Sequence, residues 1–233
     1  MVTLDRYRPT LLHIDYWPLC ALRDAVDDFT TRHANVLKGA KVLDLGSSNG
    51  PYSKPLESYG AQVALADIGP VKAGILQIDL ATGRVPLADS SVDVVFSTQV
   101  LEHVPEVNIY LQEARRLLRP DGLLFLTTHG TWYLHRLPTD MRRWTQDGLK
   151  YDIEKAGFTV SSIAPKIGIL ATSTHARAAA MRDFLLRTRL LSPLRVVSNL
   201  FFNLRMGFEE WITSEAGREK LQQLLIVTAR AVK

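Results

Sequence analysis

Short apolar runs alternate with helical patterns along most of this chain of 233 residues, and no other feature constrains its fold as strongly. A parallel strand buried on both faces reads as a nearly continuous apolar run, and a helix usually connects it to the next parallel strand. The alternation predicts an α/β fold built on a mostly parallel sheet. The runs are bounded by Gly, Pro or Asp and occupy positions 41–45, 62–66, 75–80, 92–97, 123–127, 158–163 and 224–232.

The helical patterns between these runs carry start and stop signals. Residues 105–118 place apolar side chains on one face, and residues 119–122 predict a helix stop followed by a turn. Thr145 is a typical N-cap for another helix, which ends before Gly157. Residues 15–37 predict a leading helix with apolar and polar residues interleaved.

Residues 168–220 depart from the alternation and predict a helical insertion before the last strand. Ser192 and Pro193 form a suitable N-cap and first-position pair for a helix within it. An apolar stripe at helical spacing follows, and Phe202 falls on the polar side of that stripe. The stripe consists of Val197, Leu200, Phe201, Leu204 and Phe208.

The composition is that of a folded protein, with 46% hydrophobic and 22% charged residues. A single cysteine, Cys20, excludes an internal disulfide, and its apolar helical surroundings predict a core position. The length suits one domain. Its predicted parts are a helical lead (1–37), a central core (38–165), the helical insertion (168–220) and the last strand (222–233).

The first nine residues lack the apolar stretch of a signal peptide, and no apolar run approaches the length of about 18 residues that a membrane span needs. We therefore expect a cytoplasmic protein. The net charge is +4, but residues 168–207 alone carry +5, so that the rest of the chain sums to −1. The basic character belongs to the predicted insertion.

Small residues and acids gather where the first three strands are predicted to end. Residues 42–50 read Val-Leu-Asp-Leu-Gly-Ser-Ser-Asn-Gly, and small residues in such a turn let the backbone approach a ligand closely. Asp67 ends the second run, where a carboxylate can accept from both ribose hydroxyls, and Asp79 is predicted to end the third, near an adenine amino group. A nucleoside site is predicted. Its residues are Asp44, Gly46, Ser47, Ser48, Gly50, Asp67, Ile68, Asp79, Leu80 and Gln99.

The same residues favour S-adenosylmethionine (SAM) over NAD. A pyrophosphate needs backbone amides at a helix N-terminus, and the middle glycine of the dinucleotide pattern is Ser48 here. The negative charge of Asp44 is poorly placed for a pyrophosphate, whereas it suits a ligand that carries an ammonium and a sulfonium. An NAD-binding protein and a SAM-binding protein without catalysis remain the alternatives.

These motifs together resemble the class I SAM-dependent methyltransferases, in the broad type 11 group. Residues 42–50, 85–95, 100–104 and 117–122 are similar to four motifs of that family, and Ser48 replaces the usual middle glycine of the first. The resemblance covers about residues 38–165. It implies a Rossmann-like, seven-stranded sheet with an antiparallel last strand, helices on both faces, and methyl transfer from SAM.

Transfer to a hydroxyl benefits from a general base, which is most often histidine. In an open α/β sheet that base should lie at the carboxyl ends of the middle strands. His129 and His103 both qualify, and we favour His129. His103 has the alternative role of organising the start of its helix, and His129 that of shaping the pocket as a hydrogen-bonded loop residue.

No metal is predicted. Gln99, Glu102 and His103 are similar to the Glu-x-x-Glu-His run of the ubiquinone-pathway O-methyltransferases, which is associated with a divalent cation. The first glutamate of that run is Gln99 here, and a neutral amide is a weaker ligand for a hard cation.

The loop at 132–144 packs aromatic side chains among charged ones and predicts an acceptor site. Such a set suits a sugar ring, and the loop resembles type 11 enzymes found among polysaccharide and glycolipid biosynthesis proteins. Alternatively, Arg143 and Trp144 dock the loop onto the following helix. The predicted acceptor residues are Trp132, His135, Asp140, Arg143 and Trp144.

The basic helical residues 177–208 have several possible roles: a lid over the acceptor, a homodimer face, a contact with an anionic membrane surface, or a solvated helix. Nucleic acid is not expected, because no RNA-binding module or base-stacking pattern accompanies the charge. The chain as a whole predicts O-methylation of a hydroxyl on a saccharide or glycan-related acceptor. The alternative is a small-molecule methyltransferase of secondary metabolism.

Overall fold

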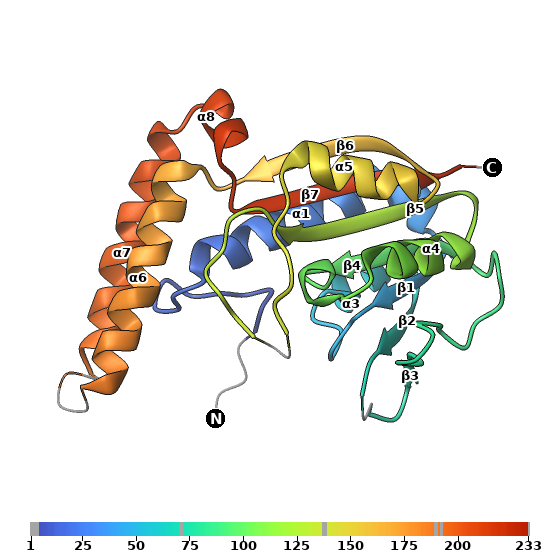
Figure 1. Ribbon diagram of the computed structural model, residues 1–233, viewed down its shortest axis with the longest axis horizontal. Coiled ribbons are helices and arrows are strands. Elements are labelled where there is room, and N and C mark those ends of the chain that lie inside the picture. The colour runs from blue at the N-terminus through green and yellow to red at the C-terminus, as the bar shows by residue number, and fades with distance from the viewer. Residues whose placement is uncertain (1–4, 70–71, 137–138, 189–190, 192, 233) are drawn as a thin grey trace. The chain divides into compact units, whose positions relative to one another are not determined.

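The computed structural model describes residues 5–69, 72–136, 139–188, 191 and 193–232 (Figure 1). Its contacts divide the chain into two compact units, whereas one domain was expected. The larger unit, residues 25–129, 135–164 and 225–233, contains nearly all of the predicted core (38–165). The smaller unit, residues 1–24, 130–134 and 165–224, joins most of the predicted lead to the predicted insertion.

Seven strands of the described residues form a single sheet in the order β3-β2-β1-β4-β5-β7-β6. Strands β3, β2, β1, β4 and β5 pair in parallel, and Figure 1 shows β7 running against its neighbours. The predicted Rossmann-like α/β fold is confirmed. The strands are β1 Lys41–Leu45, β2 Gln62–Asp67, β3 Ile75–Gln77, β4 Val92–Thr98, β5 Leu118–His129, β6 Phe158–Lys166 and β7 Leu224–Ala231.

The helices follow the predicted positions with changed ends. Helix α5 begins after Thr145, whose hydroxyl accepts from the amide of Gly148 as a side-chain cap. The prediction of a single leading helix was wrong, because the helix is interrupted at His33 and forms α1 and α2. The helices are α1 Tyr16–Arg32, α2 Ala34–Leu37, α3 Ser53–Ser58, the short 3-10 helix η1 Leu101–His103, α4 Val107–Leu117, α5 Gln146–Lys155, α6 Ile169–Arg187, α7 Leu194–Ile212 and α8 Glu215–Lys220.

The turn predicted at residues 119–122 is instead part of β5. The strand starts at Leu118, directly after α4, and pairs with β4 through a register shift between Val92 and Val94. Asp121 takes a positive φ of 62° within this irregularity. The Pro-Asp-Gly sequence therefore makes a bulge at the start of an interior strand of the sheet rather than a free turn.

The central strands are buried on both faces, as their continuous apolar runs predict. Every residue of β1 after Lys41 is buried, and the aromatic rings of Phe96 and Phe125 stack at a centroid distance of 4.9 Å. Helices α4 and α5 contribute Leu111, Ala114, Leu149 and Ile153 to a core cluster that also contains residues of β1. This rigid centre fixes the carboxyl ends of β1, β4 and β5, where the predicted functional residues lie.

A buried polar network holds the smaller unit together. The fully buried His175 faces Asp15 Oδ1 through Nε2 at 3.1 Å, and the side-chain amide of Gln223 approaches its Nδ1 at 2.6 Å. Tyr133 also donates to Asp15 Oδ1 at 3.1 Å. Burial works to raise the pKa of Asp15, but the hydrogen bond and charge of His175 outweigh it and lower that pKa. Cys20 is buried, as predicted.

The helices of the insertion are present, and the apolar stripe lies on the exposed side of α7. All of its members are exposed, whereas Phe202 is half-buried and packs with the cluster of Ile14, Ala178 and Ala179. The N-cap predicted at Ser192 lies outside the described residues, and Pro193 occupies the N-cap position of α7. Among the described residues, none of the helices has the length and apolar character of a membrane span.

Candidate functional site

A tight loop follows β1, and its backbone is tied to the end of β2. The amides of Gly46 and Ser47 both donate to Ala66 O, at 2.8 and 3.1 Å, and Gly50 donates to Ser47 O at 2.8 Å. Gly46 has a φ of 82°, and a Cβ added there would lie 2.5 Å from Val100. Glycine is therefore required at this position, and the backbone stays open to a ligand.

Ser48 occupies the place of the family's middle glycine, and it keeps a glycine-like conformation. Its φ is 52°, and its amide donates to Asp67 Oδ2 at 2.5 Å. Asp67 Oδ1 accepts from the amide of Ile68 at 2.7 Å. The ribose-side acid predicted at Asp67 therefore lies directly beside the Gly46–Gly50 loop, where the loop itself orients it. Ile68 is exposed next to it.

Asp44 lies below this loop as a buried carboxylate, 1% exposed. Neither of its oxygens has a hydrogen-bond partner among the described residues. Burial, with a smaller effect from the charge of Asp67, raises the pKa of Asp44 to about 7. A buried carboxylate is costly unless it is paired, so this position calls for a cationic or hydrogen-bond-donating ligand. The ammonium and sulfonium of SAM meet that requirement, and the open glycine backbone leaves room for the nucleoside.

The adenine-side prediction needs a correction. Asp79 does not end β3, because pairing with β2 stops at Gln77, opposite Asp67. Asp79 instead closes an exposed turn in which its Oδ1 accepts from the amides of Ala81 and Thr82, at 2.7 and 3.2 Å. Leu80 projects from this turn with 72% of its surface exposed.

Beyond β4 and β5 the sheet brings a buried glutamate next to the predicted base. Glu102 Oε1 lies 3.1 Å from His129 Nε2, and Glu102 Oε2 accepts from Thr128 Oγ1 at 2.9 Å. Both members of the pair are almost fully buried. Burial raises the pKa of Glu102, and burial together with the charge of Arg143 holds the pKa of His129 well below its usual range. His129 is therefore neutral near pH 7.

The sequence indicates where Glu102 and His129 lie along the chain, but it does not show that they are in contact. Glu102 follows β4 and His129 ends β5, and adjacent parallel strands bring their carboxyl ends to one edge. Glu102 was noted only within the ubiquinone-pathway motif and was not predicted as a site residue. The pairing of β4 with β5 is the feature that identifies Glu102 as a neighbour of His129.

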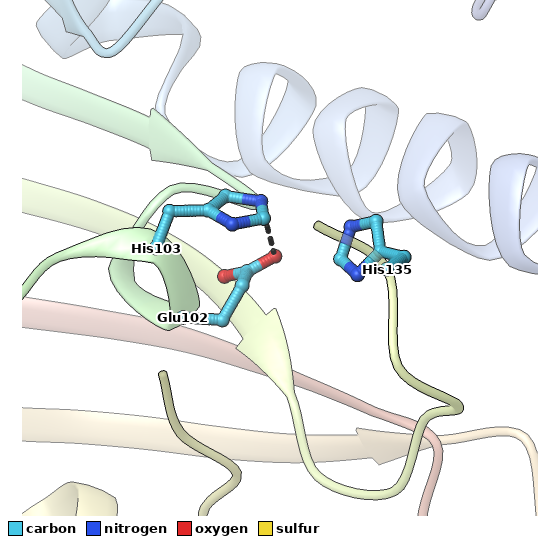
Figure 2. Close-up of side chains that lie close together, drawn as sticks. All are labelled: Glu102, His103 and His135. Carbon is cyan, nitrogen blue, oxygen red and sulfur yellow. Dashed lines mark ion pairs between the residues drawn. The ribbon is translucent and has the colours of Figure 1, made fainter. Parts of the chain in front are cut away.

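Two further histidines surround Glu102. Figure 2 shows the ring of His103 beside the Glu102 carboxylate, with His135 entering from the loop after β5. His103 Nε2 lies 3.9 Å from Glu102 Oε1, and its Nδ1 contacts Thr139 O, so the ring links η1 to that loop. The ring of His135 lies 5.0 Å from that of His103 and 5.1 Å from that of His129, between centroids.

One carboxylate oxygen and two imidazole nitrogens of this cluster lie within 4.8 Å of one another, which is the spacing of metal ligands. Gln99 replaces a ligand of the related motif, and its Nε2 donates to Thr127 Oγ1 at 2.9 Å. Thr128 and Thr139 already engage Glu102 and His103. We therefore expect dialysis against EDTA to leave methyl transfer unchanged. A loss that added Mg²⁺ or Zn²⁺ restores would contradict this expectation.

Most of the predicted acceptor residues hold the loop in place. Arg143 makes a bidentate ion pair with Asp140, at 2.5 and 2.7 Å, and Asp140 also accepts from the amide of His135 at 2.9 Å. The hydrogen bonds from Arg143 are the largest cause of a strongly lowered pKa at Asp140. Trp132 belongs to the smaller unit, where it stacks on Tyr133 at a centroid distance of 5.2 Å.

Trp144 is 7% exposed, packs in the main core, and donates through Nε1 to Asp152 Oδ2 of α5 at 2.9 Å. This contact matches the alternative in which the residue docks the loop onto the following helix. We expect Trp144→Phe to lower the free energy of unfolding by about 1 kcal/mol, for one lost hydrogen bond, with KM for the acceptor unchanged. Thermal denaturation and steady-state kinetics test this, and a raised KM with unchanged stability would restore Trp144 as an acceptor contact.

Comparison with known proteins agrees with the site geometry. A family model described as a methyltransferase domain matches residues 43–126, which include the Gly46–Gly50 loop and Glu102. The chain is 30% identical over 162 residues to a ubiquinone biosynthesis O-methyltransferase of Azorhizobium caulinodans, covering 57% of this chain and 64% of that protein. It is 36% identical over 124 residues to a protein of the same name from Xanthomonas oryzae pv. oryzae, covering 48% and 52%. The chain thus spans less than two thirds of these curated relatives.

The fold is also similar to that of solved methyltransferase structures. The structure of the Burkholderia thailandensis 1,6-didemethyltoxoflavin-N1-methyltransferase, with bound 1,6-didemethyltoxoflavin and S-adenosylhomocysteine, matches with a TM-score of 0.55 at 17% identity. The match covers 91% of this chain and 79% of that one, and it shows the fold. Residues 43–126 therefore match a methyltransferase domain, and the chain has the fold of the SAM-dependent methyltransferases.

Proposed function

We propose that the protein transfers the methyl group of SAM to a hydroxyl group of its acceptor. The observation that carries this proposal is the buried Glu102–His129 pair at the carboxyl edge of the sheet. Strands β1 and β5 are both neighbours of β4, so the ends of β1 and β5 lie about 10 Å apart. That spacing leaves room for a cofactor over Asp44 and an acceptor oxygen near His129.

In this mechanism the residues align the reactants and move one proton. SAM supplies an activated methyl carbon, whose bond to sulfur breaks as the bond to the acceptor oxygen forms, in line, and sulfur keeps the electron pair. Neutral His129 takes the hydroxyl proton on the nitrogen that does not face Glu102. The Glu102 carboxylate at 3.1 Å then stabilises the imidazolium.

The relatives, rather than the loop, support the proposed acceptor class. Asp140, Arg143 and Trp144 bind other protein groups, which weakens the saccharide acceptor expected from the sequence. The curated relatives are named for O-methylation in ubiquinone biosynthesis. An acceptor with a phenolic hydroxyl group, on a ring related to the quinones, is therefore favoured over a saccharide.

The test is transfer of a labelled methyl group from SAM to matched acceptors. A catechol, its doubly O-methylated derivative and a simple glycoside form a suitable panel. The proposal predicts labelled product with the catechol alone, and mass spectrometry should place the methyl group on oxygen. Labelling of the glycoside alone would favour the saccharide acceptor. Labelling on nitrogen or carbon would contradict the proposal.

A further inference from the structure

Helix α7 of the smaller unit presents an apolar face to solvent along its whole length. Five members of this face recur at intervals of three or four residues, which is the spacing of one helix face. Trp211 is 80% exposed and Val197 65% exposed. Contiguous apolar surface of this kind is rare on soluble monomers and marks an interaction site. The face consists of Val197, Phe201, Leu204, Phe208 and Trp211, and we refer to it as the α7 face.

Hydrogen bonds on the opposite side of α7 fix this orientation. The side-chain amide of Asn203 donates to Leu11 O and His13 O, each at 2.8 Å, and Asn199 donates to Leu12 O at 2.8 Å. The carbonyl of Asn203 accepts from Trp17 Nε1 at 2.7 Å. Turning the apolar residues inward would break all four bonds, so the α7 face is a stable surface of this unit.

Helix α6 packs alongside α7 (Figure 1). It exposes apolar residues mixed with arginine. Met181 and Phe184 are exposed on it, as are Arg177 and Arg187. Helix α6 carries three arginines against one acid, Asp183, whereas the two arginines of α7 are matched by Glu209 and Glu210. Exposed apolar side chains therefore share this helix pair with an excess of positive charge that lies on α6.

The charge decides between two occupants of the α7 face. A second copy of the chain packed on this helix pair would bring the exposed arginines of both α6 helices to one interface, and like charges in contact are unfavourable. An anionic bilayer accepts both components, because the apolar side chains enter the boundary of the acyl chains and the arginines meet the phosphates. We infer that the α7 face, together with the arginines of α6, docks the protein on an anionic membrane surface.

Vesicle flotation of the intact protein tests this inference. Binding is expected to vesicles that contain phosphatidylglycerol and not to pure phosphatidylcholine, and it should weaken as salt rises. Trp211 lies in the docking face, so its fluorescence should shift to shorter wavelength on binding. Equal partition into both kinds of vesicle, or none into either, would overturn the inference.

Two variants separate the apolar and charged components. Phe201→Gln with Leu204→Gln, and separately Arg177→Gln with Arg187→Gln, should each weaken partition about tenfold or more. The matched control is Ile109→Gln with Tyr151→Gln, which changes two exposed apolar residues on α4 and α5 and should bind as the wild type does. Circular dichroism melts of each variant report folding separately from binding.

Sedimentation velocity tests the alternative that the α7 face binds a second copy of the chain. The inference predicts a monomer in the absence of vesicles for the wild type and for the Phe201→Gln, Leu204→Gln variant. A wild-type dimer that the same double substitution dissociates would assign the α7 face to a second copy and overturn membrane docking. Neither result depends on methyl transfer, so a failure of this inference is distinct from a failure of the proposed function.

Discussion

Replacing His129 with alanine is expected to slow methyl transfer by about 10²- to 10⁴-fold, the usual contribution of a general base. The cofactor loop lies at β1, so the affinity for S-adenosylhomocysteine should stay at the wild-type level. Single-turnover rates and calorimetry measure the two quantities on the same preparation. A near-normal rate would remove His129 from the mechanism.

The pH profile separates a base from a merely structural histidine. The active form is neutral His129, and burial with the charge of Arg143 lowers its pKa. The rate should therefore stay high as the pH falls through the usual histidine range near 6.5 and decline only below it. Glu102→Gln should also slow transfer, because it removes the charge that stabilises the imidazolium. A profile with its acid limb at the ordinary histidine pKa would contradict a role for His129.

His103 supplies the matched comparison. Its Nδ1 contacts Thr139 O, so its main role is to connect η1 to the loop after β5. His103→Asn should lower thermal stability and change the rate less than His129→Ala does. The reverse order of rate effects would transfer the role of base to His103.

Replacing Asp44 with asparagine is expected to have opposite effects on binding and on stability. The affinity for S-adenosylhomocysteine should fall about 10- to 100-fold, as for a deleted charged partner. The free energy of unfolding of the ligand-free protein should rise at pH 8, because an unpaired buried carboxylate is removed.

The pH dependence of this effect follows from linkage. The pKa of Asp44 is about 7 in the folded protein and near the ordinary aspartate value of 3.8 in the unfolded chain. The folded state therefore binds the proton more tightly, and stability is lost as the pH rises from about 4 to about 7, at about 1.4 kcal/mol per unit. The Asp44→Asn variant should lack that loss and should match the wild type near pH 4. Denaturant unfolding at both pH values tests this, and an equal stability difference at both would contradict the raised pKa.

How far the sequence predicts this protein depends on how local each signal is. The alternation of apolar runs predicts all seven strands, because burial on both faces requires continuous apolar sequence. The acid at the end of β2 and the glycines after β1 are also predicted from local sequence, because a tight turn needs particular residues at particular positions. The end of β3 is not predicted correctly, because the pairing of β3 with β2 stops at Gln77 and Asp79 lies beyond it.

The contacts that the sequence does not predict are those between distant residues. Glu102 and His129 are separated along the chain by all of α4 and nearly all of β5, and only the pairing of β4 with β5 brings them together. The ion pair of Asp140 with Arg143 is local, yet a run of aromatic and charged residues does not show whether they face a ligand or one another. The same limit applies to α7, because its apolar stripe does not show which side of the helix packs inward, and the hydrogen bonds of Asn199 and Asn203 decide it.

Titration of the purified protein with S-adenosylhomocysteine by calorimetry, with NADH as the control, tests the central claim most directly. The geometry of Asp44, Gly46 and Asp67 predicts binding of S-adenosylhomocysteine in the micromolar range and no heat from NADH. Binding of NADH alone, or of neither compound, would contradict a SAM site at the end of β1.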